Sequence, residues 1–357
     1  MKNETLCRGA YEKLRRLRTT FDRNYRITKL YADYLNLCPD ILTAPMVKAL
    51  TEEGVEETYA IAALLGEIFG LDGERRPEDR RLMRNYLQPS VRILDHQKYE
   101  NDPYYRTVKI SDRKMGEWEF RNETYAPYRG IICDDMTAGD DFSEVPPLGF
   151  FPEGFSFPAV LEGGNEWMTL TPVDMDTCRD PIARAHGQVV TFGLGLGYFA
   201  FMAAHKPEVT SVTVVERSHD VIRLFREVLL PQFPQGDKIR IVQDDAFRYA
   251  ENIMPGMGFD YAFADTWRDA SDGLPMYLRM RRLESRNPGT VFDYWIEGFL
   301  LSRLRALVFE DIWAKESADP THAGTGATGS FDTVVQMLSR EGLRQISLTY
   351  PLENLWF

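Results

Sequence analysis

An apolar run that opens into alternating glycines constrains this chain more than any other feature of its sequence. The run is Val189-Val190-Thr191-Phe192-Gly193-Leu194-Gly195-Leu196-Gly197. It predicts a buried strand that turns directly into a helix, because glycine adopts backbone conformations that a Cβ forbids. Gly193 and Gly195 are expected to shape the turn, and Gly197 is expected to leave room for a ligand against the first turn of the helix. The run therefore indicates a bound cofactor.

A carboxylate at the end of the next apolar run strengthens this interpretation. Glu216 closes the segment Ser211-Val212-Thr213-Val214-Val215-Glu216. A carboxylate at this position of a Rossmann-type unit can accept hydrogen bonds from both hydroxyls of a ribose. The two features together predict an adenosine-containing cofactor.

The pattern after residue 187 alternates between short apolar runs and helical segments. Strands are expected near 188–193, 210–216, 238–243 and 259–264, and helices near 197–205, 218–229 and 246–253. This alternation predicts an α/β fold with a Rossmann-like, doubly wound parallel sheet. A further helix is expected near 274–285, but no fifth strand is evident after it.

The last hundred residues are expected to be mainly helical. One long helix is predicted from a single apolar stripe formed by Phe292, Trp295, Ile296, Phe299, Leu300, Leu304, Leu307, Val308 and Ile312. Residues 317–330 are small and polar, which predicts a flexible loop. A helix after residue 331 and a strand near 344–349 are expected to follow.

The N-terminal part has a different pattern. Residues 8–100 show helical periodicity, for example Glu57 to Phe69 with Gly70 as a C-cap. Between residues 104 and 134 the period approaches two, which predicts strands at 106–110 and 117–120 around a turn at 114–116. Residues 134–157 suggest a connecting loop, or alternatively a lid or a substrate wall.

The expected domains are thus a helical one at 1–100, a small β unit with its connecting loop at 101–165, and a Rossmann-like cofactor-binding domain at 166–357.

The charge balance bears on the partners of the chain. Its 357 residues include 42 Lys and Arg and 54 Asp and Glu, for a net charge of −12. This excess disfavours nonspecific binding to nucleic acid or anionic membrane and mildly favours a cationic small-molecule substrate, although it also serves solubility. The first thirty residues are locally basic, at Arg15, Arg16, Arg18, Arg23, Arg26 and Lys29. An exposed helix face explains them more simply than contact with RNA or an acidic partner.

Cysteine and histidine usage points to a reduced compartment. Cys7, Cys38, Cys133 and Cys178 form no CxxC pair, and the histidines show no metal-binding spacing. The chain is therefore expected to be cytoplasmic, without disulfides, structural metal or a signal peptide. A homodimer is left open.

Acidic residues recur where the predicted strands end. Glu216, the pair Asp244-Asp245 before Ala246, and Asp265 each follow a strand, as the glycine turn does. In an open parallel sheet, ligands bind outside the carboxyl ends of the strands at the switch point. These positions are therefore expected to converge on one crevice.

These residues resemble the class I S-adenosylmethionine-dependent methyltransferases, and within them the spermidine synthase-like branch, over about residues 189–265. The resemblance implies that Gly193, Gly195 and Gly197 pass under the methionine part and ribose of S-adenosylmethionine. It further implies that Glu216 holds the ribose hydroxyls and that Asp245, with Ala246, meets the adenine amino group. Asp265 would face the transferred group.

The chain also departs from the family pattern. Thr191 stands where many methyltransferases carry an acid, although the spermidine synthase branch often lacks that acid too. Aminopropyltransferases carry Asp-x-x-Asp after the fourth strand, whereas this chain has Asp265-Thr266-Trp267-Arg268-Asp269. Arg268 would repel an ammonium substrate, so an aminopropyl transfer would need Asp269 as the second carboxylate.

A nicotinamide dinucleotide is a competing cofactor, because Gly195-Leu196-Gly197-Tyr198-Phe199-Ala200 fits the GxGxxA pattern and Glu216 follows at a suitable distance. Asp245 favours the methyltransferase, since a nicotinamide enzyme needs no acid there. A noncatalytic protein that only binds an adenosine cofactor is a third alternative.

The expected activity is methyl transfer from S-adenosylmethionine to an unidentified acceptor, with a cationic one as a candidate. Asp265 is the candidate to take a proton from the acceptor or to orient it, with a helix N-cap as the simpler alternative. Trp267 and Asp269 are candidate substrate contacts, although core packing explains Trp267 more simply. The segment from Trp167 to Asp174 is expected to fold over the methionine end of the cofactor, or else to start a helix at Pro172.

Overall fold

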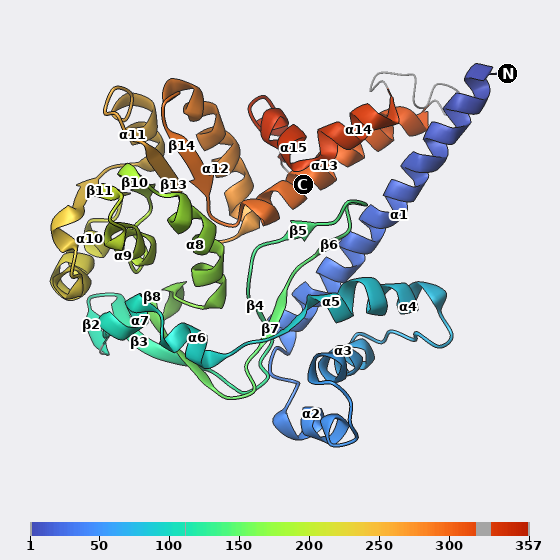
Figure 1. Cartoon of the computed structure of the whole chain (residues 1–357), viewed down its shortest axis with the longest axis horizontal. Coiled ribbons are helices and arrows are strands. Elements are labelled where there is room, and N and C mark those ends of the chain that lie inside the picture. The colour runs from blue at the N-terminus through green and yellow to red at the C-terminus, as the bar shows by residue number, and fades with distance from the viewer. Residues whose placement is uncertain (1, 111, 319–329, 356–357) are drawn as a thin grey trace.

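The computed structural model describes residues 2–110, 112–318 and 330–355, without the side chains of residues 2–10, 115, 317, 318, 353 and 354. The N-terminal hundred residues are helical, as the periodicity predicts (Figure 1). The helix from Glu57 ends one residue before Phe69, and Gly70 follows at φ +64°, which confirms the expected C-cap region. The elements are α1 (Lys2–Leu37), α2 (Ala44–Thr51), α3 (Glu57–Ile68), α4 (Pro77–Leu82), a π turn (Met83–Leu87), α5 (Gln88–Ser90), β1 (Val91–Ile93) and α6 (His96–Glu100).

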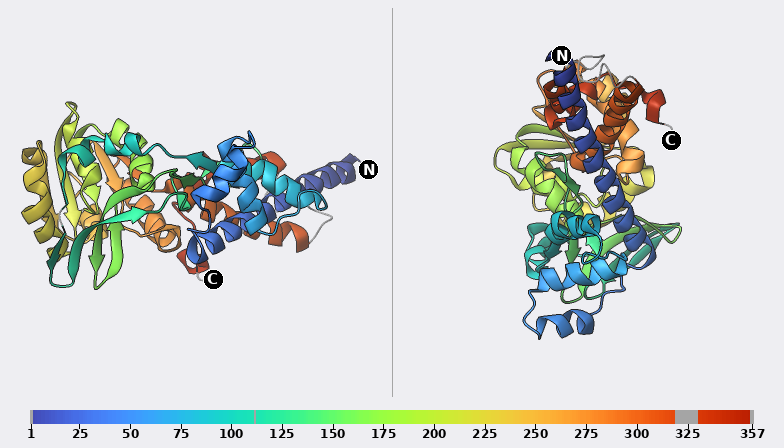
Figure 2. Two further views of the ribbon diagram at one scale, coloured as in Figure 1. Left: turned by 90° about the horizontal axis from the view of Figure 1, so that it is seen from below. Right: turned by 90° about the vertical axis from the view of Figure 1, so that its right-hand side faces the viewer.

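The long helix α1 runs along the molecule and packs on the C-terminal helix α13 (Glu297–Ala318), as Figures 1 and 2 show. Phe21 stacks on Phe309 with ring centroids 4.1 Å apart. The basic residues of α1 are largely paired with acids of the same chain, at Arg18–Glu310, Arg23–Glu78, Arg26–Asp79 and Lys29–Asp33. This pairing favours the exposed-face interpretation over a contact with RNA.

An antiparallel sheet follows, and its first strand lies later in the chain than expected, whereas the strand expected at 117–120 is confirmed. Residues 106–110 are not a strand: α7 (Pro103–Thr107) covers the first two of them and residues 108–110 have no regular structure. The helix forms here because Asp102 caps it and Pro103 stands at its first position. The sheet has the order β2-β3-β8-β9. Its strands are β2 (Arg113–Met115), β3 (Trp118–Tyr125), β8 (Phe155–Glu162) and β9 (Asn165–Thr169).

Residues 134–157 were expected to form a connecting loop, and this expectation is wrong in part. The segment contains β5 (Thr137–Ala138), β6 (Glu144–Val145) and β7 (Leu148–Phe150), and it runs into β8. The strand β7 pairs with β1 and with β4 (Ile131–Ile132), so it connects the helical region to the β region. The hydrophobic residues Leu148 and Phe150 are fully buried, which explains why this stretch is ordered.

The C-terminal half is the predicted Rossmann-like unit, an entirely parallel five-stranded sheet in the order β12-β11-β10-β13-β14. The first four strands lie where the sequence predicts them. The strands are β10 (Gly187–Phe192), β11 (Val209–Glu216), β12 (Ile239–Gln243), β13 (Tyr261–Ala264) and β14 (Val291–Tyr294). The order reverses between β10 and β13, which makes their carboxyl ends the switch point.

Helices cover both faces of this sheet, and the residues of each strand alternate between them. Val189 and Phe263 pack in one hydrophobic cluster with α9, whereas Val190 and Ala262 pack in a second cluster with α12. The first cluster also contains residues of α8 and α10, and the second contains residues of α11. The helices are α8 (Pro172–Arg184), α9 (Tyr198–His205), α10 (His219–Leu224), continued by a π turn (Phe225–Leu229), α11 (Ala246–Asn252) and α12 (Ala270–Leu283).

The structure corrects two expectations near the C-terminus. A fifth strand is present: β14 contains Phe292, which the sequence assigned to the long helix, and that helix begins only at Glu297. The strand expected near 344–349 is wrong, because α15 (Arg340–Ile346) covers its start. The predicted helix α14 (Phe331–Leu338) is confirmed, whereas most of the loop expected at 317–330 lies outside the described residues.

Several short elements complete the fold. They are 3-10 turns at Leu230–Gln232, Gly236–Lys238, Glu284–Arg286 and Leu352–Leu355. Within the described ranges, no helix combines the length and hydrophobicity needed to cross a bilayer. Cys38, Cys133 and Cys178 are free thiols.

Candidate functional site

The glycine turn joins β10 to α9 at the switch point of the sheet. All three glycines have positive φ angles, +96° at Gly193, +56° at Gly195 and +77° at Gly197. A Cβ on Gly193 would collide with the backbone carbonyl of Asp265, which follows β13. Gly193 thus lets two strand ends approach each other, and its requirement for glycine is steric as well as conformational.

Gly197 is confined by a side chain of the protein. The ring of Phe225 lies where a Cβ on Gly197 would stand, so only glycine fits at this position. Its N–H donates to the carbonyl of Leu194 at 2.8 Å. Gly195 is less crowded, with the sulfur of Met168 3.5 Å from the position of a Cβ.

Two amides of the turn remain available for a ligand. The N–H groups of Gly195 and Leu196 have no hydrogen-bond partner among the described residues, although the neighbouring N–H groups of Leu194 and Gly197 are bonded. They lie directly before the N-terminus of α9, where the aligned peptide dipoles favour negative charge.

Glu216 reaches back to this turn from the end of β11. One carboxylate oxygen accepts from the N–H of Leu194 at 3.2 Å and the other from the N–H of Ser218 at 2.7 Å. A carboxylate offers about four acceptor positions, so two remain for the hydroxyls of a ribose. The sequence placed Glu216 in this region correctly, and the structure adds that it also ties the turn to the loop before α10.

The two acids after β12 differ from expectation in their exposure: Asp244 is buried and Asp245 is exposed. Asp245 is exposed and caps α11 by accepting from the N–H of Arg248 at 2.9 Å. Asp244, interpreted from the sequence as a solvated loop acid, is only 6% exposed and accepts from the Nε of Arg248 at 2.6 Å. Ala246 is the first residue of α11. Contact between Asp245 and an adenine amino group therefore requires a carboxylate oxygen to accept a second hydrogen bond besides the one from Arg248.

Asp265 lies at the end of β13, next to the glycine turn. Its carboxylate has no hydrogen-bond partner among the described residues. Burial and the nearby negative charge of Asp174 raise the pKa of Asp265 to about 8. It is not the N-cap of α12, which is Asp269, so this alternative for Asp265 is wrong.

Asp174 stands on the first turn of α8, in the segment expected to cover the cofactor. Pro172 starts that helix, and Thr171 caps it by donating to the carboxylate of Asp174 from its N–H and hydroxyl, both at 2.8 Å. Burial raises the pKa of Asp174 to about 6. The helix-start alternative for Pro172 is therefore confirmed, and the same segment brings Met168 against Gly195.

The residues after Asp265 divide into two groups. The hydroxyl of Thr266 and the indole N–H of Trp267 are buried and have no hydrogen-bond partner in the described part of the chain. Trp267 is 5% exposed and packs in the core, as the simpler alternative had it. Asp269 accepts from the N–H of Ser271 at 2.6 Å as the N-cap of α12, and Arg268 is exposed. Thr266, which the sequence did not single out, is a further unsatisfied group beside the turn.

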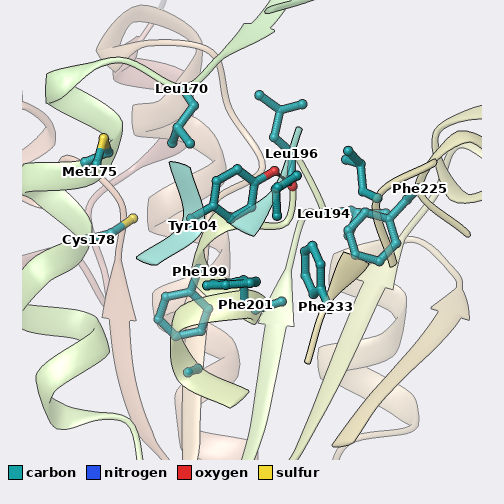
Figure 3. Packing of buried hydrophobic residues seen from close by; sticks show 14 of the residues in the cluster. Tyr104, Leu170, Met175, Cys178, Leu194, Leu196, Phe199, Phe201, Phe225 and Phe233 are labelled. Atoms are coloured by element: carbon teal, nitrogen blue, oxygen red, sulfur yellow. Dashed lines mark hydrogen bonds between the residues drawn. The ribbon is translucent and has the colours of Figure 1, made fainter. Parts of the chain in front are cut away.

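Helix α7 contributes residues that the sequence gave no reason to select. The hydroxyl of Tyr104 donates to the carbonyl of Leu196 at 2.6 Å, and Figure 3 shows its ring beside the glycine turn. Tyr105 donates to the carbonyl of Leu170 at 2.5 Å. The only local signal was an Asp-Pro pair before two tyrosines, which predicts a helix start but no site.

The site contains a small apolar cavity. The cavity, of about 10 Å³, lies between Gly195, the helix α10 with its π turn, and the antiparallel sheet. The described part of the chain holds no group of three His, Cys, Asp or Glu residues that could bind a metal ion.

Comparison with known proteins finds similarity to solved structures. No family model matches the chain, and no curated protein matches its sequence. The chain is similar to spermidine synthase from Thermotoga maritima, with a TM-score of 0.30 and 13% identity over 42% of this chain. The match spans 55% of that protein, about half its length. Similarity at this level says nothing about activity, and the Rossmann-like fold assigned here rests on the strand order.

Proposed function

We propose that the chain binds S-adenosylmethionine at the glycine turn and transfers its methyl group to an amine. The unpaired carboxyl of Asp265 carries this proposal. Asp265 is half-buried, and a carboxyl group that lacks a hydrogen-bond partner among the described residues and faces a second acid is retained most readily where a ligand completes its contacts. Its neighbour Asp174 adds a second negative charge, so a cationic ligand is favoured over an anionic one.

The residues of the turn fit the cofactor in charge and in hydrogen-bonding capacity. The free N–H groups of Gly195 and Leu196 can bind a carboxylate, and Glu216 has acceptor positions left for ribose hydroxyls. When bound, S-adenosylmethionine supplies a methyl group on a sulfonium, which departs as a neutral thioether and needs no proton.

Asp265 then acts on the acceptor. An ammonium has a pKa near 10, so it must lose a proton before its nitrogen can attack. Asp265 takes that proton in its ionised form, whose population grows as the pH approaches its pKa of about 8, and it then becomes a neutral acid. The nitrogen lone pair forms the bond to the methyl carbon while the carbon–sulfur bond breaks, and its electrons remain on the sulfur.

Aminopropyl transfer is less well supported. It needs a second carboxylate after β13, and Asp269 already caps α12 while Arg268 stands exposed beside it. A nicotinamide cofactor is the second alternative. Asp245, which favoured the methyltransferase, caps α11, and this role does not distinguish between the two cofactors. The test therefore includes both alternatives.

Calorimetric titration with S-adenosylmethionine, S-adenosylhomocysteine, decarboxylated S-adenosylmethionine and NAD separates these functions. Micromolar binding of the first two is expected, and preference for either of the others would contradict the proposal. Primary amines are then screened as acceptors by measuring the release of S-adenosylhomocysteine. Asp265→Asn should retain cofactor binding and lose turnover, whereas Asp237→Asn, at an exposed position of the same domain, should change neither.

A further inference from the structure

Two hydrogen bonds tie α7, which precedes the antiparallel sheet, to the start of α9. The hydroxyl of Tyr104 donates to the carbonyl of Leu196 at 2.6 Å, and the hydroxyl of Tyr198 donates to the carboxylate of Asp102 at 3.1 Å. The other oxygen of Asp102 accepts from the N–H of Tyr104 at 2.8 Å. Tyr104 is only 1% exposed, and its ring packs edge-on against those of Tyr198 and Phe201. The position of the Tyr104 hydroxyl is therefore fixed from several sides.

The bond from Tyr104 acts on a single peptide plane of the glycine turn. The carbonyl of Leu196 and the N–H of Gly197 belong to the same peptide unit. The hydroxyl of Tyr104 donates to the oxygen of this unit, and the N–H of this unit donates to the carbonyl of Leu194 at 2.8 Å. Glycines on both sides of Leu196 permit many backbone conformations, so this plane would otherwise rotate at little cost. With both ends held, the preceding N–H groups of Leu196 and Gly195 stay unpaired and in one arrangement.

We propose that Tyr104 is a positioning residue for the cofactor site, one that preorganises the glycine turn from outside the Rossmann-like unit. The inference rests on the proposed function as far as the identity of the ligand is concerned. The fixing of the turn does not depend on that identity. Preorganisation saves the cost of ordering the turn when the ligand binds, so its loss should weaken binding.

The test compares two tyrosines that differ in place but not in chemistry. Tyr104→Phe removes the hydroxyl at the turn. Tyr31→Phe removes an equally buried hydroxyl that bonds to the hydroxyl of Ser90 at 2.6 Å, in the N-terminal helical region. Hydrogen exchange without ligand reports on the bonded N–H groups of Leu194, Gly197 and Phe201. Titration with S-adenosylhomocysteine reports on binding.

The expected result is faster exchange at these three amides in Tyr104→Phe alone, with affinity reduced about fivefold, the equivalent of one hydrogen bond. Similar global stability of the two variants in urea would show that the effect is local. Unchanged exchange and unchanged affinity in Tyr104→Phe would overturn the inference. If the wild-type protein binds none of the adenosine ligands, only the proposed function fails, because the exchange measurement still decides whether Tyr104 fixes the turn.

Discussion

Asp174 raises the pKa of Asp265 across 91 residues of sequence. The first acid stands on the opening turn of α8 and the second at the end of β13, and the negative charge of Asp174 adds to burial in moving the pKa of Asp265 to about 8. Two neighbouring carboxyl groups cost free energy because each disfavours the ionisation of the other. Such pairs are common where a ligand or a reaction makes use of them. The same relationship makes the stability of the protein depend on pH.

Asp265→Asn should stabilise the protein, and the gain should grow as the pH rises from about 4 to about 8. In that window the unfolded chain has lost the proton of Asp265 and the folded chain still holds it. Ionisation therefore favours unfolding, and stability falls with rising pH. An amide cannot ionise, so the variant escapes this loss and should gain at least about 1 kcal/mol by pH 8. Urea unfolding at pH 5 and pH 8 measures it, and an equal effect at both values would contradict the raised pKa.

Glu216→Ala should weaken the binding of S-adenosylhomocysteine by about 1.5–3 kcal/mol, the range for hydrogen bonds to a charged group. Part of this loss would come from the turn itself, because Glu216 also accepts from the N–H groups of Leu194 and Ser218. Glu216→Gln keeps one acceptor oxygen and should lie between the wild type and the alanine variant. Calorimetric affinities that are equal in all three proteins would refute the ribose assignment.

Gly197→Ala should destabilise the protein more than Gly195→Ala. Both positions have positive φ, so the backbone strain is similar, but only the Gly197 Cβ would meet the Phe225 ring. The smaller side chain in Phe225→Leu should recover part of the Gly197→Ala loss in a double-mutant cycle. Thermal unfolding of the four variants gives the coupling, and its absence would mean that Phe225 does not confine Gly197.

The sequence predicts the sheet better than the surroundings of the site. Strands β10, β11 and β13 are largely buried, so each is a mainly apolar run that ends at or before a glycine or an acid, and this pattern is local. The edge strand β12 is partly exposed and contains Arg240. The strand β14 merges with the apolar stripe of α13. Only the backbone break at Ile296, with φ +46°, separates them, and no residue type signals it. The contacts of Tyr104 with Leu196 and of Asp174 with Asp265 join segments about ninety residues apart, and packing alone creates them.

A buried ion pair connects the strand β6 to α13. Replacing one partner alone should lower the free energy of unfolding more than replacing both. Glu144 and Arg305 are each 4% exposed and hydrogen-bonded to each other, and Ser302 donates to the other oxygen of Glu144 at 2.7 Å. Glu144→Met leaves the Arg305 guanidinium in the core without its counter-charge, which should cost about 3–5 kcal/mol. The double variant Glu144→Met with Arg305→Met buries no charge and should unfold in urea at a higher midpoint than Glu144→Met alone. If it unfolds earlier, the unpaired Arg305 guanidinium is not the source of the cost, because its remaining contacts, such as the bond from Nε to the carbonyl of Leu338, outweigh its desolvation.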